Sequence, residues 1–122
     1  MVHKRKHMNI EFPEDEGKEI IEFSLATGVC VKFAIVENTQ EKIFTLLLFS
    51  SKFEHKSIVS ERLKQNNRFI GAGKIDLNSG LAKWGSSSCK VEFGYDKPSD
   101  SAEARSLLED IHKQLKTLIK SW

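Results

Sequence analysis

The sequence predicts a single α+β domain with a mixed or antiparallel sheet of five to six strands, one short internal helix and one long C-terminal helix. Several segments alternate apolar and polar residues and are separated by short turns, which is typical of neighbouring strands. Two other segments repeat apolar residues at intervals of three and four, which is typical of helices that pack on a sheet. A chain of 122 residues is long enough for one hydrophobic core and short for two.

The composition argues against a nucleic-acid partner and a membrane span, and it favours a cytoplasmic location. With 39% hydrophobic and 30% charged residues, the chain has the balance of an ordinary globular protein. Its formal net charge of +2 is too small to predict a nucleic-acid partner. The longest apolar run, Leu46 to Phe49, is too short for a membrane span or a signal peptide. Cys30 and Cys89 lie in strand-like runs, so we expect free thiols in the reducing cytoplasm.

The N-terminal residues 1–16 are predicted to form a flexible polar tail, which leaves residues 17–122 as the folded domain. The tail begins with the basic cluster His3 to His7, and Pro13 discourages regular structure near its end. This cluster is interpreted as a solvated end of the chain.

Three strands are predicted next, followed by a helix. Phe23 and Leu25 alternate with polar neighbours, and turn residues separate the later segments; the predicted strands are Lys18 to Leu25, Val29 to Val36 and Lys42 to Phe49. The last of these is apolar on both faces and is therefore expected at the centre of the sheet. From Ser50 the period changes to that of a helix, with Ser50 or Ser51 as its cap and Asn66-Asn67 as its end.

The chain is then expected to return to strands and to finish in a helix. Arg68 to Leu77 is an extended segment interrupted by two glycines, Leu81 to Trp84 is a short one, and Cys89 to Tyr95 is the last strand. The final helix is the clearest pattern in the chain: Asp100 and Glu103 form a capping box. Its apolar stripe consists of Ala104, Leu107, Leu108, Ile111, Leu115, Leu118, Ile119 and Trp122. His112 lies beside this stripe and is interpreted as a half-exposed surface residue.

The stretch from Ser50 to Lys74 carries the chemistry that the sequence offers. His55 stands where the internal helix should begin, and Gly71-Ala72-Gly73 is followed directly by Lys74. The free amides of a first helical turn and the backbone of a glycine-rich turn both favour an anion, and a lysine adds full charge. An imidazole beside such a site can transfer protons or a phosphoryl group near neutral pH.

Each of these features also has a purely structural interpretation. Glycines inside a strand, such as Gly71 and Gly73, can mark a β-bulge or a close approach of another backbone. A histidine in a first helical turn can be an ordinary surface residue, and most lysines are solvated. The functional hypothesis therefore requires that Lys32 and Lys74 converge with His55.

The run from Gly28 to about Leu108 resembles the Janus/Ocnus family, which includes phosphohistidine phosphatase. The similarity is carried by Gly28-Val29 with Lys32, by Glu54-His55 before a helix, by Gly71-Ala72-Gly73-Lys74-Ile75 and by Gly94-Tyr95-Asp96. Order and approximate spacing agree over about two thirds of the chain.

The resemblance implies a metal-independent hydrolysis of phosphohistidine or a related phosphoramidate, without a cofactor. His55 takes the position of the catalytic histidine, as general base or nucleophile. Lys32 and Lys74 would hold phosphate oxygens. The substrate-binding positions implied in full are Lys32, Lys74, Gly71, Gly73, Gly94, Tyr95 and Asp96. A phosphorylated protein or a small phosphoramidate is the expected partner.

Departures from the family pattern keep a second function open. Lys74 stands where the family has arginine, Asp96 where it has serine, and Pro98 removes an amide near the expected phosphate. The segment between Lys74 and Tyr95 is also longer than in the family, and the chain ends on a helix. These differences favour the alternative of a non-catalytic domain of the same fold that binds an anion or a protein. The sequence is compatible with a monomer or a homodimer.

Overall fold

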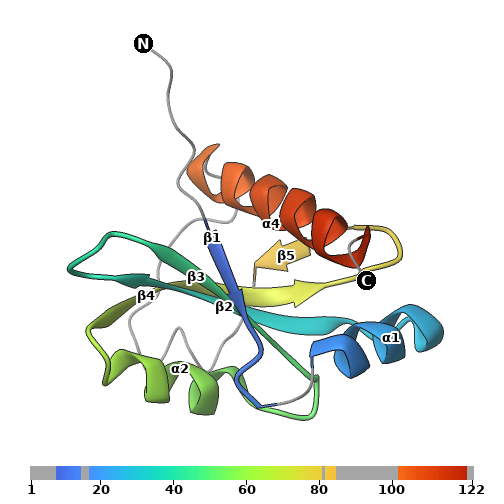
Figure 1. The fold of residues 1–122 in the computed structure, drawn as a ribbon, viewed down its shortest axis with the longest axis horizontal. Coiled ribbons are helices and arrows are strands. Elements are labelled where there is room, and N and C mark those ends of the chain that lie inside the picture. Colours follow the sequence, from blue (N-terminus) through green and yellow to red (C-terminus); the bar gives the residue numbers. More distant parts are fainter. Residues whose placement is uncertain (1–7, 15–16, 81, 85–101, 121–122) are drawn as a thin grey trace.

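The computed structural model describes residues 8–14, 17–80, 82–84 and 102–120 as an α+β fold (Figure 1). The elements of this part of the chain, in order, are β1 (Met8–Glu11), α1 (Gly17–Thr27), β2 (Val31–Asn38), β3 (Phe44–Phe49), α2 (His55–Leu63), β4 (Asn67–Ile75), β5 (Ala82–Trp84) and α4 (Ala102–Lys120).

The described strands form one mixed sheet in the order β1-β3-β2-β4-β5. β1 runs parallel to β3, whereas the β2–β3, β2–β4 and β4–β5 pairs are antiparallel. The register of β2 against β4 shifts between Ile35 and Val36, which pair with Gly71 and Phe69. Ile70 is therefore the extra residue of a β-bulge, as the glycine pattern of this strand allowed.

Helices cover both faces of the sheet, with α4 and α2 on opposite sides (Figure 1). The face toward α4 buries Phe33, Ile35 and Leu46 together with Ile111 and Leu115 of that helix. The other face packs against α2 through a second apolar cluster; its buried members are Ala34, Val36, Leu47, Phe49, Ile58, Val59 and Ala72. Since side chains alternate between the faces of a strand, the even-numbered residues of β2 face α2.

Residues 8–11 correct the predicted N-terminal tail. They form β1, an edge strand of the sheet, and Ile10 packs against the core on the α4 side. An ion pair between Glu11 and Arg62 ties this strand to α2. The sequence pattern predicts a tail here because the segment is short and follows a charged cluster, while its parallel partner β3 lies far along the sequence.

The predicted strand Lys18 to Leu25 is wrong, because this segment is helix α1. The alternating residues that suggested a strand, Phe23 and Leu25, are exposed at 59% and 36%. The buried residues are instead Ile20, Ile21 and Ser24, which share one side of a helix. The expectation of one internal helix is corrected accordingly.

The remaining described elements follow the sequence pattern closely. β2, β3, α2, β4 and β5 lie within a few residues of their predicted positions. The C-terminal helix is confirmed as α4, with Ile111 and Leu115 buried and His112 exposed. The predicted last strand, Cys89 to Tyr95, and the cap residue Asp100 lie outside the described residues.

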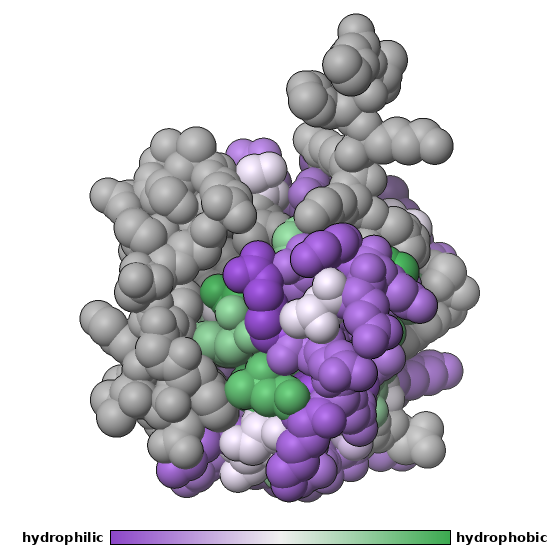
Figure 2. Space-filling view, turned by 90° about the vertical axis from the view of Figure 1, so that its left-hand side faces the viewer, coloured by the Kyte–Doolittle hydropathy of each residue, from purple (hydrophilic) through white to green (hydrophobic). Residues whose placement is uncertain are grey.

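Figure 2 shows the end of the sheet at which β2 turns into β3, where a smaller hydrophobic area borders a larger hydrophilic one. No helix in the described part of the chain is long and apolar enough to cross a membrane.

Candidate anion-binding site

His55 is held at the start of α2 by contacts with two strands. Its Nε2 lies 2.8 Å from the carbonyl oxygen of Gly73 in β4, and its ring meets the ring of Phe49 edge-on at 5.4 Å. The side chain is buried, with 6% of its surface exposed. The sequence placed His55 correctly at the head of the helix, and the alternative interpretation of an ordinary surface residue is wrong.

The contact with Gly73 defines which nitrogen of the ring carries the proton. A carbonyl oxygen accepts hydrogen bonds, so Nε2 must donate, and in the neutral ring Nδ1 keeps its lone pair. Burial lowers the pKa of His55 below its ordinary value of 6.5, and the charges of Lys32 and Lys74 lower the pKa further. The hydrogen bond to Gly73 acts in the opposite direction. The ring is therefore a neutral base with Nδ1 as its basic atom at pH 7.

The first turn of α2 adds positive potential beside this ring. Its N-cap is Glu54, whose side chain makes no capping hydrogen bond, so the predicted cap by Ser50 or Ser51 is wrong. Ser50 instead accepts the amide of Phe53 through its carbonyl in a tight turn. The first turn also contains no acidic residue and carries Lys56. The free amides of this turn and the charge of Lys56 favour an anion, whereas the carboxylate of Glu54 opposes one.

Lys32 and Lys74 lie side by side on the face of the sheet that carries α2. They are direct partners in the β2–β4 register, and side chains of directly paired residues project to the same face. Lys32 Nζ donates to the carbonyl oxygen of Phe53 at 2.6 Å, which fixes the amine beside the head of α2. A lysine amine has three hydrogens, so this contact leaves two for a ligand. Lys32 therefore lies at the head of α2, and Lys74 is its direct neighbour on the same face of the sheet.

Gly71 and Gly73 have a structural role. Both are buried strand residues that pair with β2, so the anticipated glycine-rich turn does not exist. A Cβ atom at Gly73 would overlap the backbone carbonyl of Lys83 in β5 and press on the end of the Phe33 ring. Both structural interpretations of this segment therefore apply, each at a different residue. The β-bulge occurs at Ile70, and another backbone approaches closely at Gly73.

One further cation lies in line with these residues. Lys83 is the direct partner of Lys74 in the β4–β5 register, and it is exposed. Sequence reasoning missed it because a lysine in a three-residue strand gives no signal without the register. Gly94, Tyr95 and Asp96, which the resemblance added to the site, lie outside the described residues.

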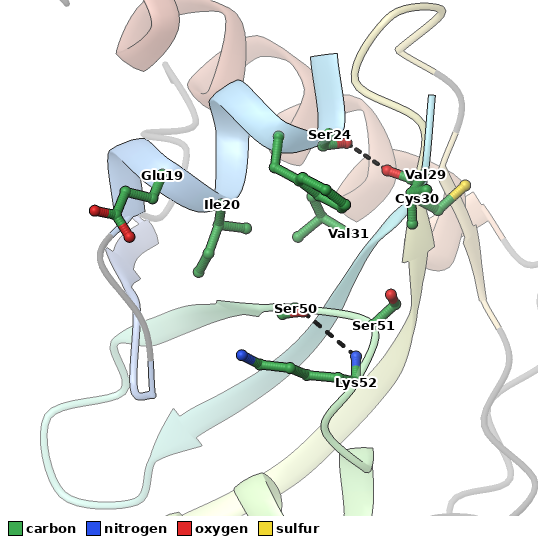
Figure 3. Close-up of a pocket in the computed structure, with 10 residues that line it drawn as sticks. Glu19, Ile20, Ser24, Val29, Cys30, Val31, Ser50, Ser51 and Lys52 are labelled. Carbon is green, nitrogen blue, oxygen red and sulfur yellow. Dashed lines mark hydrogen bonds between the residues drawn. The ribbon is translucent and has the colours of Figure 1, made fainter. Parts of the chain in front are cut away.

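Two cavities lie apart from His55. The first, about 280 Å³, lies between α1 and the turn after β3, with Ile20, Val31 and half-buried Cys30 among its lining residues (Figure 3). The second, about 490 Å³, lies beside α4 and includes His112 and Lys116. Both contain mixed apolar and polar side chains.

The described residues contain no group of three or more histidine, cysteine, aspartate or glutamate side chains that could hold a metal ion. Comparison of the chain with family models, with curated proteins and with solved structures finds no match.

Proposed function

We propose that this protein hydrolyses phosphohistidine or a related phosphoramidate, with His55 as general base or nucleophile. The observation that carries the proposal is the placement of a neutral, oriented imidazole at the head of α2 beside two lysine amines on one sheet face. The expected setting is the cytoplasm, with a phosphorylated protein or a small phosphoramidate as the substrate.

This arrangement supplies what phosphoryl transfer chiefly needs. Catalysis of such a transfer depends on positioning the phosphoryl group and on neutralising the charge of its oxygens. Lys32 and Lys74 provide that charge, and the amides of the first turn of α2 can donate to an oxygen. Lys74 does this as a point charge, without the two-pronged contact that an arginine would make.

Two routes use Nδ1 of His55. In the first, Nδ1 attacks phosphorus, the P–N bond of the substrate breaks, the departing nitrogen takes a proton from water, and a second water later releases phosphate from His55. In the second, Nδ1 removes a proton from a water molecule, which attacks phosphorus directly while the P–N bond breaks, and the proton on Nδ1 then passes to the departing nitrogen. Both routes require Nδ1 to be unprotonated, and the orientation imposed by Gly73 meets that requirement.

The direct test is turnover of phosphoramidate and of a phosphohistidine peptide by the wild-type chain and by His55→Asn. We expect the substitution to lower kcat by at least about a hundredfold, the usual contribution of a general base. His112→Asn is the matched control, since His112 is exposed on α4 on the opposite side of the sheet. Equal turnover by His55→Asn and His112→Asn would rule out the proposal.

The second candidate is a non-catalytic domain that binds an anion or a protein through the same surface. Asp96 and Pro98 favour it, because a carboxylate repels a phosphate dianion and proline lacks an amide donor. This candidate predicts saturable phosphate binding at Lys32 and Lys74 without turnover of any phosphoramidate. Phosphate release that depends on His55 would exclude it.

A further inference from the structure

We infer that Lys83 extends the anion site into a surface that selects acidic residues next to the phosphohistidine of a protein substrate. The inference rests on the proposed function, because it assigns a substrate class to that same site. It is carried by the register of three adjacent strands, which sets Lys32, Lys74 and Lys83 in one row on the α2 face.

The row leads away from His55 toward the last described strand of the sheet. Neighbouring strands lie about 4.8 Å apart, so the row spans about 10 Å from β2 to β5. Lys32 is anchored beside the head of α2, whereas Lys74 and Lys83 are exposed. A phosphoryl group near His55 engages the first two lysines, and Lys83 is then left for a second negative group.

Among the described residues, the exposed lysines of this row are not matched by the opposite charges seen elsewhere in the same strands. Like charges on directly paired residues destabilise a sheet. Within the part of the chain that the structure describes, neither Lys74 nor Lys83 has an acidic partner. At the other end of β2 and β4, the paired residues Glu37 and Arg68 form an ion pair at 2.6 Å. The fold therefore pairs opposite charges at one end of these strands and concentrates positive charge at the end next to His55.

The spacing of the row also limits where the acidic residue of a substrate must stand. Lys83 is one strand, about 4.8 Å, beyond Lys74, and an extended peptide advances about 3.3 Å per residue. An Asp or Glu within about two positions of the phosphohistidine therefore comes within reach of the Lys83 amine. A small phosphoramidate has no such group and does not use this lysine.

The test compares two peptides that carry a hydrolysis-resistant phosphonate in place of phosphohistidine, flanked by Glu in one peptide and by Gln in the other. Their binding to the wild-type chain, to Lys83→Gln and to Lys113→Gln is measured by fluorescence anisotropy at physiological salt. Lys113 is an exposed lysine of α4 and serves as the control. We expect the wild-type chain to prefer the Glu peptide, and Lys83→Gln to weaken that peptide's binding by about twofold to fivefold, the effect of one exposed charge pair.

The companion readout is turnover of phosphoramidate, which Lys83→Gln should leave unchanged. Absence of phosphoramidate turnover by the wild-type chain counts against the proposed function. The preference for the Glu peptide over the Gln peptide tests the role of Lys83 independently of turnover. Equal binding of the two peptides, or equal effects of Lys83→Gln and Lys113→Gln, would overturn the inference. The inference would also be overturned if a single-stranded oligonucleotide of the same net charge bound more tightly than the Glu peptide and did so through Lys83. That result would assign the row of lysines to nucleic-acid binding.

Discussion

His55 is a neutral, buried histidine that both stabilises the fold and keeps a basic nitrogen. Its Nε2 satisfies a carbonyl of β4, so the ring contributes to packing, and its Nδ1 keeps a lone pair for chemistry. The same burial that orients the ring lowers its pKa. The stability of the fold, and the activity that we propose, are therefore both coupled to the protonation of this one side chain.

The lowered pKa of His55 predicts how stability depends on pH. Below pH 6.5 the histidine of the unfolded chain binds a proton while the folded one stays neutral, so the unfolded state holds more protons. The free energy of unfolding should thus fall as the pH decreases from 6.5 toward the lower folded pKa. Above pH 6.5, His55 contributes no pH dependence to the free energy of unfolding.

Chemical denaturation at a series of pH values measures this slope. His55→Gln, which retains an amide donor for Gly73, should remove the part of the slope that belongs to His55, while His112→Gln should retain it. If the two variants show the same pH dependence as the wild-type chain, the lowered pKa is wrong. The kcat/KM for phosphoramidate should fall as the pH decreases through the pKa of folded His55, which lies below 6.5.

Gly73 predicts a coupling between packing and activity. Gly73→Ala places a methyl group against the Lys83 carbonyl and the Phe33 ring, so β4 and β5 must separate, and the acceptor of His55 moves with them. We expect a loss of about 1–3 kcal/mol in the free energy of unfolding, typical of overpacking. Phosphoramidate turnover should fall as well.

Gly28→Ala is the matched control for Gly73→Ala. Gly28 ends α1 with a φ of 77° and has no neighbour within 4 Å of an added Cβ. Gly28→Ala should lower the free energy of unfolding by about 1–2 kcal/mol, because a residue with a Cβ is strained in the left-handed conformation. Phosphoramidate turnover should stay unchanged. Unchanged activity in Gly73→Ala would show that the position of this carbonyl does not control His55.

At the level of elements, the sequence predicts the strands and helices whose buried residues follow one clear period. β2, β3 and α4 were recovered because their apolar residues alternate, run continuously or repeat at three and four. α1 was missed because Phe23 and Leu25 mimic an alternating strand although they are exposed, and the buried set includes polar Ser24. Ser24 is accommodated by donating its hydroxyl to the Val29 carbonyl at 2.6 Å, a contact that no pattern reveals.

β1 was missed for a different physical reason, which yields a prediction. A four-residue edge strand derives its stability from partners that are remote in sequence, here β3 and, through Glu11, α2. Ile10→Ala should lower the free energy of unfolding by about 1–2 kcal/mol, since half-buried Ile10 loses part of the contacts of a core isoleucine. Urea denaturation measures the change.

The control for Ile10→Ala is Asn9→Ala, because Asn9 is exposed on the same strand. This substitution should stay within about 0.5 kcal/mol of the wild-type chain, as surface changes usually do. Equal, negligible effects of both substitutions would mean that residues 8–11 behave as the tail that the sequence predicts.

The candidate site was only partly predictable at the scale of the whole molecule. The sequence identifies His55, Lys32 and Lys74 as candidates, but their place on one face of the sheet follows from two long-range facts: the β2–β4 register and the packing of α2 on that face. Lys83 and the structural role of Gly73 depend on the β4–β5 register, which a single sequence does not encode locally. The molecule thus gathers positive charge from three strands and one helix at one end of the sheet.

The measurement that tests this account most directly is a titration with inorganic phosphate, followed by NMR of the histidine rings and backbone amides. Chloride at equal ionic strength serves as the control. We expect saturable shifts of the His55 ring and of the first amides of α2, together with Gly94, Tyr95 and Asp96, while the exposed His112 ring stays unchanged. A His55 ring that does not respond at millimolar phosphate, or that shifts no more than His112, would contradict the assignment of an anion site to His55, Lys32 and Lys74.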